Sequence, residues 1–400
     1  MNIPSSRRAT YTNNDITYTW DNVSEIKYYN WMKMTSPEKR EDFTVDGFPF
    51  FIQIEPTNYC NLKCPICPAG GLGFKRSKRH MNLGEFKSII DDMEDYLLFI
   101  TLWDWGEPLL NPELPEMISY AAERDIKTVV STNCNCMHFH DEAYMERLLR
   151  SGLSTLILAV DSLHQDSYEM YRKKGDLAGA LAGIKRVISL KKKLDSETLL
   201  ILRMVVMRQN EHQIAAMRRL ARNLGVDRFS LKTVNPLYIA ESSDKDIVPK
   251  NPRYRRYQYK EGTFERLRKE YTCDIVWRQC TIHSNGNIVP CCWFYDEDHK
   301  AGNVLSNGGL KRLWNSQSYR DFRRKILLDK ESISYCKTCT FNYKFSRAGW
   351  FLQTLDLTQS RKDQYTYLLK RYVELNMYPN LLKEIIRTRD KVKSFLGCNK

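Results

Sequence analysis

The sequence lacks any apolar run long enough to cross a membrane. A transmembrane helix needs about 18 consecutive apolar residues, and no segment of the 400-residue chain approaches that length. The first residues, Met1 to Arg8, also lack the apolar core of a secretory signal peptide. We therefore expect a cytoplasmic, globular protein, whose 42% hydrophobic residues can form one large domain with one or two smaller ones.

Acidic residues are too few to balance the basic ones. The chain has 62 Lys and Arg against 48 Asp and Glu, a formal net charge of +14. A surplus of this size could attract nucleic acid, an anionic membrane surface or a phosphorylated substrate. It is concentrated between Lys245 and Lys269 and from Arg361 onward. Because no nucleic-acid-binding motif accompanies it, we interpret it as a solvated basic face and do not expect nucleic acid as a partner.

Disulfides are not expected, because the cytosol keeps thiols reduced. The 12 cysteines therefore indicate metal or cluster ligation. Three of them, Cys60, Cys64 and Cys67, share one loop directly after the apolar stretch 48–54. The loop has no fourth cysteine, so a four-iron cluster held there would keep one iron for a non-protein ligand. The alternatives are a zinc knuckle, which usually pairs its cysteines as Cys-x2-Cys with a distant second pair, or three unrelated buried thiols.

From residue 48 the chain alternates segments typical of strands with amphipathic segments typical of helices. This alternation predicts a parallel α/β fold, and six units predict an open partial barrel rather than a closed eight-fold one. Gly152 and Gly225 are expected to end two of the helices. The predicted strands are 48–54, 99–104, 127–132, 155–160, 199–206 and 228–232, and the predicted helices are 23–34, 83–96, 112–124, 141–151, 177–194 and 211–224.

Polar motifs follow the predicted strands, where barrels of this kind carry their chemistry. The second strand leads into the run from Trp103 to Pro108, in which glycine would let the backbone approach a ligand closely. The third strand ends in Thr132 and Asn133, and the fourth is followed by Asp161. Arg203 lies inside the apolar fifth strand, where it needs an anionic partner or a route to solvent.

The Cys-x3-Cys-x2-Cys loop resembles the signature of the radical S-adenosylmethionine (SAM) enzymes, which share a partial (β/α)6 barrel. The resemblance implies a [4Fe-4S] cluster on these three cysteines, with SAM chelating the open iron. Trp105 and Ala159 depart from the family's Gly-Gly-Glu-Pro and Ser-x-Asp motifs. For Arg203 the SAM carboxylate is one candidate partner, and a structural salt bridge is the other. The implied ligands are Cys60, Cys64 and Cys67 for the cluster, and Gly106, Glu107, Pro108, Thr132, Asn133, Asp161 and Arg203 for SAM.

A second cysteine-rich region begins after a charged linker that contains proline. Asn285-Gly286 predicts a hairpin turn shortly before Cys291. The segment 273–340 resembles the SPASM/Twitch extension of radical SAM enzymes, which binds auxiliary four-iron clusters. A structural zinc ribbon on the same thiols is the alternative. The resemblance implies one auxiliary [4Fe-4S] cluster on Cys273, Cys291, Cys336 and Cys339, with Cys280 or Cys292 able to replace Cys273 or Cys291.

These features predict five segments. The amphipathic basic tail could lie on a membrane, although packing back on the protein is the commoner arrangement. Cys134 and Cys136 are interpreted as buried structural thiols, and Cys398 as a terminal residue without a catalytic role. The segments are an N-terminal extension (1–47), the barrel (48–235), a basic linker (236–272), a SPASM/Twitch-like auxiliary cluster domain (273–345) and a basic helical tail (346–400).

The resemblance implies a radical SAM enzyme, most simply an oxidoreductase. It would cleave SAM reductively to a 5′-deoxyadenosyl radical, with electrons from a donor such as flavodoxin or ferredoxin, and abstract a hydrogen atom from its substrate. Because residues 1–47 do not look like a leader-peptide-recognition domain, we expect oxidation of a small polar substrate such as a sugar or aminocyclitol. The alternatives are radical modification of a peptide or protein (maturation, crosslinking or epimerisation) and a non-catalytic, zinc-stabilised nucleic-acid-binding protein.

Overall fold

The computed structural model describes residues 7–13, 16–137, 141–236 and 238–346. The predicted basic tail therefore lies outside the described residues from 347 onward, and Cys398 lies there too. No helix in the described ranges has the length and apolar character needed to span a membrane.

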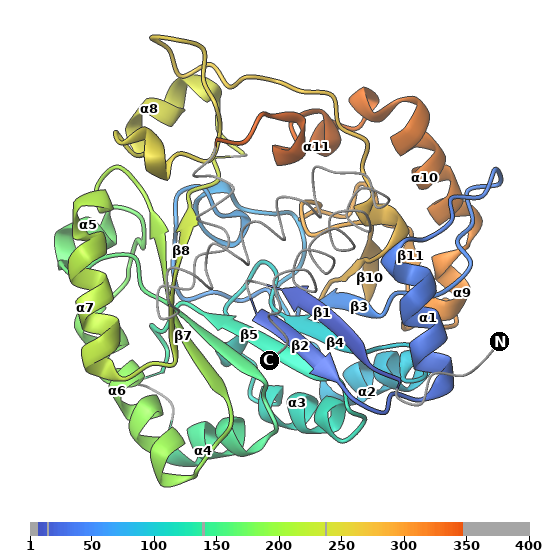
Figure 1. Cartoon of the computed structure of the whole chain (residues 1–400), viewed down its shortest axis with the longest axis horizontal. Coiled ribbons are helices and arrows are strands. Elements are labelled where there is room, and N and C mark those ends of the chain that lie inside the picture. The colour runs from blue at the N-terminus through green and yellow to red at the C-terminus, as the bar shows by residue number, and fades with distance from the viewer. Residues whose placement is uncertain (1–6, 14–15, 138–140, 237, 347–400) are drawn as a thin grey trace, which may run out of the picture.

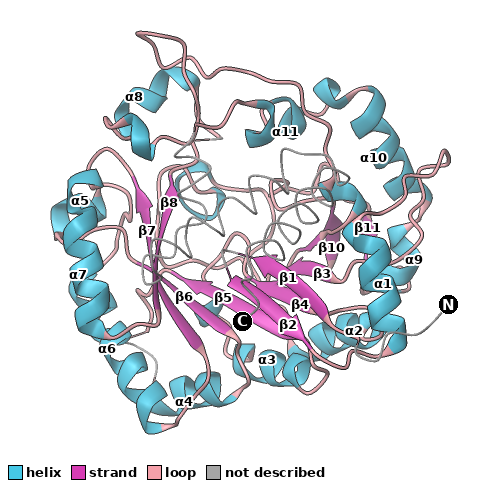
Figure 2. Cartoon of the chain, viewed as in Figure 1, coloured by secondary structure: helices cyan, strands magenta, loops and turns pink. Residues whose placement is uncertain are grey.

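Six parallel strands form the partial barrel that the sequence predicted (Figures 1 and 2). Each strand pairs with the next one along the chain, so β3 and β8 are the two ends of this parallel set. All four residues of β4 and all five of β6 are buried, as expected for parallel strands covered on both faces. The strands are β3 (Phe51–Ile54), β4 (Phe99–Leu102), β5 (Lys127–Thr132), β6 (Thr155–Ala159), β7 (Leu199–Val206) and β8 (Arg228–Thr233).

Amphipathic helices cover the outer side of the strands (Figure 2). Asn82 and Glu85 form a capping box that starts the first of them. Gly225 ends α7 with a left-handed φ of 76°, and Gly152 follows α4 with a φ of 79°, as predicted. The predicted helix over 211–224 starts with a 3-10 turn, η3 (Glu211–Gln213). The helices are α2 (Leu83–Met93), α3 (Leu114–Ala122), α4 (Glu142–Arg150), α5 (Gln165–Glu169), α6 (Leu177–Lys193) and α7 (Ile214–Leu224).

The first barrel strand begins later than predicted. Phe48 was expected to open it, but its backbone N–H donates to Asn30 Oδ1 at 2.8 Å, and the strand starts at Phe51. Asn30 lies on α1 (Glu25–Thr35), the helix expected over 23–34. A side chain of the N-terminal segment thus takes the hydrogen bond that a sheet partner would otherwise supply.

The N-terminal segment covers one end of the barrel. Its strands β1 (Ala9–Asn13) and β2 (Ile16–Trp20) form an antiparallel hairpin. Tyr11 and Tyr18 pack on Phe99, with ring centroids 5.2 and 4.8 Å away, and the Tyr18 hydroxyl is 2.8 Å from Thr155 Oγ1. Phe99 and Thr155 are the first residues of β4 and β6. The hairpin therefore lies at the amino ends of the strands, opposite the predicted site.

The cysteine-rich region continues the barrel sheet. Strand β9 (Thr281–Ile282) pairs parallel with β3, and β10 (Asn287–Val289) pairs antiparallel with β9 and β11 (Gly302–Asn303). The predicted turn separates β9 from β10, with Gly286 at a φ of 82°. The two domains thus share one nine-stranded sheet. Three helices follow: α9 (Gly309–Trp314), α10 (Gln317–Leu328) and α11 (Ser334–Lys337).

The predicted basic linker is folded rather than extended. It contains α8 (Asp244–Ile247), and the isolated antiparallel bridge between Tyr257 and Phe345 joins it to the end of the cysteine-rich domain. The interpretation of the linker as a solvated basic face is wrong for Arg266. Its guanidinium is buried and contacts both oxygens of Asp244 at 2.6 and 2.7 Å. The short turns in and after the linker are η4 (Glu241–Ser243), η5 (Pro252–Tyr254), η6 (Ile275–Trp277), η7 (Lys330–Ser332) and η8 (Thr340–Asn342).

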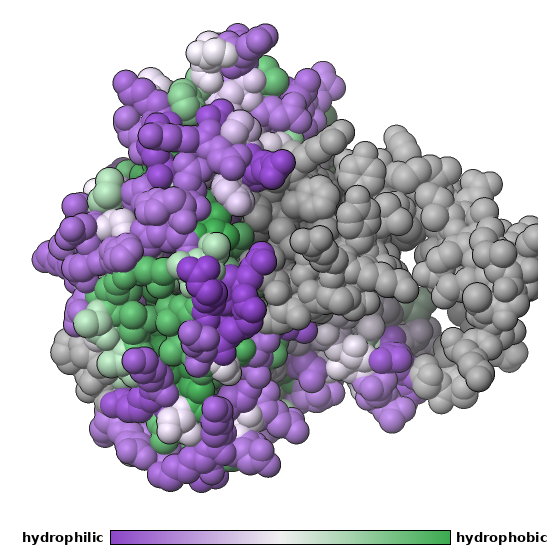
Figure 3. All heavy atoms as spheres, turned by 60° about the vertical axis from the view of Figure 1, so that its left-hand side comes forward, coloured by the Kyte–Doolittle hydropathy of each residue, from purple (hydrophilic) through white to green (hydrophobic). Residues whose placement is uncertain are grey.

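One large apolar core runs through the barrel, the N-terminal hairpin and the cysteine-rich domain. A second, smaller cluster of Met207, Val234 and Val248 lies where the linker returns to the ends of β7 and β8. Figure 3 shows hydrophilic side chains over most of the visible described surface, with hydrophobic side chains gathered near its middle.

Candidate functional site

The cysteine loop follows β3 and is folded tightly on itself. The backbone N–H of Gly71 donates to Cys64 O at 2.9 Å, and that of Leu72 donates to Cys67 O at 3.2 Å. These bonds close a single π-helical turn, η1 (Pro68–Leu72). A Cβ on Gly70 would lie 2.6 Å from Cys64 O, so no side chain fits there. The two glycines thus let the chain fold back over the three thiols.

Burial disfavours the thiolate form of all three cysteines of the loop. Burial raises the pKa of Cys60 to about 11 and that of Cys67 to about 12. Burial also raises the pKa of Cys64, against the lowering effect of Arg172. Iron binding must therefore displace the thiol protons. Among the residues that the structure describes, no group of three or more Cys, His, Asp or Glu side chains is placed to hold a single metal ion.

Glu107 connects the cysteine loop to the end of β5. Its carboxylate accepts hydrogen bonds from the backbone N–H of Asn133 at 2.7 Å and of Leu109 at 3.2 Å. Its own N–H donates to Tyr59 O at 2.7 Å. Burial raises the pKa of Glu107 to about 7. The carboxyl group of Glu107 thus holds two backbone segments in place, and its pKa lies close to neutral pH.

The glycine of this motif makes its close approach to the protein rather than to a ligand. A Cβ on Gly106 would lie 2.1 Å from Thr57 O, in the segment that leads into the cysteine loop. Pro108 is buried and starts the 3-10 turn η2 (Pro108–Leu110). Gly106 and Pro108 therefore fix the position of the Glu107 carboxylate.

Asn133 reaches the cluster loop directly. Its Nδ2 is 3.7 Å from Cys60 Sγ and donates to Asn61 Oδ1 at 3.0 Å. Thr132 Oγ1 accepts from the backbone N–H of Cys134 at 3.0 Å. The predicted residues from the ends of β3, β4 and β5 thus lie together. Cys134 is fully buried within the apolar core.

Asp161 lies at the same edge but is already paired. Its Oδ2 accepts from Arg172 Nε at 2.7 Å, and its Oδ1 accepts from the backbone N–H of Val205 at 2.8 Å. The charge of the Arg172 guanidinium also lowers the pKa of the nearby Cys64 thiol. Arg172 is therefore part of the site, although its sequence context, Tyr171-Arg172-Lys173, is that of an exposed basic run.

Arg203 is buried on β7, opposite Ala159 of β6 and Ser230 of β8. Its Nε donates to Ser230 Oγ at 3.0 Å. This neutral hydroxyl is neither of the two partners considered from the sequence.

The second cysteine set surrounds one cavity. Aromatic side chains, Tyr271, Trp293 and Phe294 among them, line it with the thiols and limit water access. Cys280 and Cys292 are not among its lining residues: Cys280 lies near Arg323, and Cys292 O accepts from Trp105 Nε1 at 3.0 Å. The four thiols that line the cavity are Cys273, Cys291, Cys336 and Cys339.

A buried polar network joins the barrel to the cysteine-rich domain. Arg76 contacts both oxygens of Glu55 at 2.7 Å, and Ser284 N donates to Glu55 Oε2 at 3.0 Å. Burial and the charge of Glu55 raise the pKa of Asp104 well above its usual range. Burial lowers the pKa of His283 to about 4, and its Nε2 lies 3.8 Å from Asp104 Oδ2. No sequence motif indicated this network, because its members are far apart in the chain.

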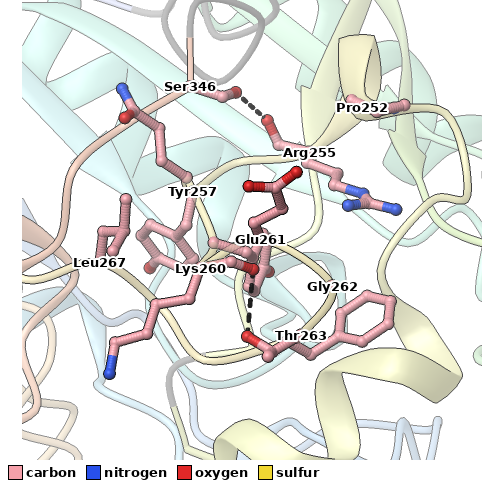
Figure 4. A pocket seen from close by; sticks show the side chains of 12 residues that line it. Pro252, Arg255, Tyr257, Lys260, Glu261, Gly262, Thr263, Leu267 and Ser346 are labelled. Carbon is pink, nitrogen blue, oxygen red and sulfur yellow. Dashed lines mark hydrogen bonds between the residues drawn. The ribbon is translucent and has the colours of Figure 1, made fainter.

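An open pocket of about 560 Å³ lies in the linker, and no predicted site residue lines it (Figure 4). Arg255, Tyr257 and Lys260 are among the lining residues. Lys260 is paired with Glu265 at 2.5 Å.

Two protein families match the chain. Residues 54–221 match the radical SAM superfamily, and residues 273–340 match the iron-sulfur cluster-binding domain SPASM. The PqqA peptide cyclase of Granulibacter bethesdensis is 28% identical over 186 residues, which are 46% of this chain and 47% of that protein. The chain thus spans about half the length of this relative.

Two further proteins are similar over more of their length. The antilisterial bacteriocin subtilosin biosynthesis protein AlbA of Bacillus subtilis is 22% identical over 349 residues, which are 80% of this chain and 75% of AlbA. The structure of Streptococcus suis SuiB bound to S-adenosylmethionine has a TM-score of 0.54 at 18% identity, covering 79% of this chain and 76% of SuiB. This structural likeness shows the fold.

Proposed function

Starting from the membership of this chain in the radical SAM superfamily, in the subfamily that carries a SPASM domain, we propose that it modifies a peptide by radical chemistry. Its cofactors are SAM, the [4Fe-4S] cluster that binds SAM, and auxiliary iron-sulfur clusters. The observation that carries the radical chemistry in this proposal is the convergence of Glu107 and Asn133 on the Cys60 loop. When bound to the reduced cluster and cleaved there, SAM would supply an organic radical able to remove a hydrogen atom from an unactivated carbon.

The residues of the barrel rim fit the cofactors that they would hold. Cys60, Cys64 and Cys67 would ligate three irons, and the nearby positive charge of Arg172 would favour the thiolate form of Cys64. Glu107 would accept a hydrogen bond from the SAM ammonium group, which favours its ionised form against the effect of burial. The other proposed SAM-binding residues are Thr132, Asn133, Asp161 and Arg203, whereas Gly106 and Pro108 would act by fixing the position of Glu107.

A peptide substrate has more support than the small polar substrate expected from the sequence. The relatives include a protein named as a peptide cyclase and another named for bacteriocin biosynthesis. Neither name indicates a sugar or an aminocyclitol. The expectation of a sugar rested on the N-terminal segment, and that segment packs against the amino ends of the barrel strands, away from the site.

We further propose net oxidation of the substrate. Cys273, Cys291, Cys336 and Cys339 would hold an auxiliary cluster inside the aromatic-lined cavity, which could accept an electron from the substrate radical. A reduced flavodoxin or ferredoxin would supply the electron that starts each turnover.

The test uses anaerobically reconstituted protein with SAM, a reductant and candidate deuterated peptides and sugars. Cys64→Ala is expected to abolish 5′-deoxyadenosine formation without changing the fold. Cys398→Ala, which removes a cysteine for which we predict no catalytic role, is the matched control. Deuterium appearing in 5′-deoxyadenosine with a peptide identifies the substrate class, whereas transfer from sugars alone would refute the peptide proposal. Full 5′-deoxyadenosine production by Cys64→Ala would refute the radical SAM mechanism.

A further inference from the structure

The carboxyl end of β8 holds a group of polar atoms that the protein leaves without hydrogen bonds. Three atoms there are buried and lack a partner: Thr233 Oγ1, Asn235 Nδ2 and Arg256 Nε. Leaving a buried donor or acceptor unpaired costs free energy, so a group of such atoms calls for a partner that the protein does not supply, such as water, an ion or a ligand. The three residues are neighbours. Arg256 Nη2 lies 3.5 Å from Thr233 O, and the hydroxyl of the next residue, Tyr257, donates to Asn235 Oδ1 at 2.6 Å.

Arg256 is half-buried and, unlike three other arginines of the described chain, is not paired with an acid. Arg76 contacts Glu55, Arg172 contacts Asp161, and Arg266 contacts Asp244. No carboxylate is paired with Arg256 within the described residues. Desolvation by burial accordingly lowers its pKa, and Tyr257 supplies the main opposing interaction. The buried side of the Arg256 guanidinium therefore has no negative charge beside it, and a carboxylate placed there would supply one.

The surrounding structure holds Arg256 in place. Tyr257 is buried, pairs with Phe345 across an isolated antiparallel bridge, and contacts Thr340 Oγ1 through its hydroxyl. The preceding residue, Arg255, turns to the open pocket of Figure 4, where its Nε donates to Pro249 O at 2.9 Å. Arg256 is thus fixed between the last barrel strand and the cysteine-rich domain.

We propose that Arg256, Thr233 and Asn235 form a binding site for a carboxylate of the substrate. A planar guanidinium suits the two oxygens of a carboxylate, and a hydroxyl and an amide N–H can donate to the same group. The site lies at the strand ends that also carry the cysteine loop. This inference rests on the proposed peptide substrate and refines it: the peptide presents either an acidic side chain or its C-terminal carboxylate to β8.

The experiment measures binding of three small probes to the reconstituted holoenzyme by calorimetry. The probes are N-acetyl-glutamate N-methylamide, which carries a side-chain carboxylate, N-acetyl-alanine, which carries a terminal one, and N-acetyl-glutamine N-methylamide, which carries neither. We expect one of the two carboxylates to bind at least about tenfold more tightly than the glutamine probe, because a charged hydrogen bond is lost with the amide. The tighter of the two identifies the source of the carboxylate.

Variants connect the binding to the site. Arg256→Met is expected to weaken carboxylate binding at least about tenfold, and Arg256→Lys less, since lysine keeps the charge but not the planar fork. Thr233→Val, which keeps the shape of the side chain and removes the hydroxyl, is expected to weaken it several-fold and guards against misfolding as the cause. Arg253→Met is the matched control, because Arg253 is exposed on the same segment, and it should bind as the unmodified protein does.

Three results would overturn the inference. They are equal binding of the glutamate, alanine and glutamine probes, unchanged carboxylate binding in Arg256→Met, and a parallel loss of SAM affinity in that variant, which would assign the guanidinium to the cofactor. The proposed function is tested separately by deuterium transfer. Carboxylate binding at Arg256 without transfer from any peptide would therefore count against the peptide proposal alone.

Discussion

Glu107 shows how one buried carboxyl group can connect structure and cofactor. It holds the backbone of Asn133, whose side chain is 3.7 Å from Cys60 Sγ. Burial raises its pKa to about 7, so a cation beside it would shift it to the ionised form. The ammonium group of SAM bound at this position would therefore stabilise the negative charge of Glu107, which burial disfavours.

Glu107→Gln should weaken SAM binding while leaving the fold intact. The amide keeps an acceptor for Asn133 N but loses the charge, and we expect about a tenfold loss of SAM affinity. SAM titration of the reconstituted protein measures it, with the apparent Tm as the folding check. Glu113→Gln is the control, since Glu113 accepts from Leu83 N at the start of α2, away from the cysteine loop. Unchanged SAM affinity in Glu107→Gln would rule Glu107 out as a SAM ligand.

His283 should make the protein sensitive to acid. Its pKa is about 4 in the folded protein against 6.5 for the ordinary group, because burial disfavours the imidazolium. Between these values the unfolded chain binds the proton and the folded protein does not, so stability falls as the pH drops through this window. The contribution is about 2 kcal/mol at pH 5. We expect the loss of apparent Tm between pH 7.5 and pH 5 to be smaller in His283→Gln, and an equal loss would contradict this.

Spacing along the chain revealed some of these residues and hid others. Cys60, Cys64 and Cys67 could be predicted because the loop is continuous and its residue types are rare. Arg172 could not, since it lies among the lysines 173 and 174 and shows its role only through its contacts with Asp161 and Cys64. Arg256 was hidden in the same way by the basic linker around it.

At the scale of elements, the cysteine loop depends on the loop after β4. Gly106 packs so closely on Thr57 that a Cβ would lie 2.1 Å from its carbonyl oxygen. The contact is with the backbone of Thr57, which cannot move aside as the end of a flexible side chain can. The loop that follows β4 therefore determines the position of the segment before Cys60.

Gly106→Ala should disturb iron binding at the first site. The added methyl group must push Thr57 away, and we expect about 1–3 kcal/mol of destabilisation together with loss of up to half of the bound iron. Iron analysis and the apparent Tm measure both effects. Gly84→Ala is the matched control: Gly84 lies in the first turn of α2, where the nearest atom to an added Cβ is the side-chain oxygen of Asn82 at 3.3 Å rather than backbone. Full iron content in Gly106→Ala would show that the loop adapts.

Elements with strong patterns could be predicted from sequence, and those defined by tertiary contacts could not. The strands β5 and β7 were predicted to the residue, because their apolar runs are bounded by polar segments. The hairpin of β1 and β2 was missed, since its Thr and Tyr residues show little contrast between faces. Its role depends on packing of Tyr11 and Tyr18 against Phe99, which lies far along the chain.

For the whole molecule, the two cysteine sets should hold separate clusters. We expect about eight irons per chain in the reconstituted protein and about four in Cys291→Ser. Cys292→Ser is a stringent control, because Cys292 is the adjacent residue but does not line the cavity. It should keep all its iron. If Cys292→Ser loses iron and Cys291→Ser does not, Cys292 rather than Cys291 is the cluster ligand. Zinc in place of iron would favour a structural zinc ribbon.

The pairing of β9 with β3 has a consequence for how the protein is made. Ser284 donates to Glu55 across 229 residues of sequence, so the open edge of β3 stays uncovered until most of the chain has left the ribosome. Contacts this distant slow folding and expose strand edges. The first cysteine loop follows that same strand. Delivery of iron and sulfide to the nascent chain before residue 284 emerges would therefore meet an incomplete site, and cluster insertion should follow release of the full chain.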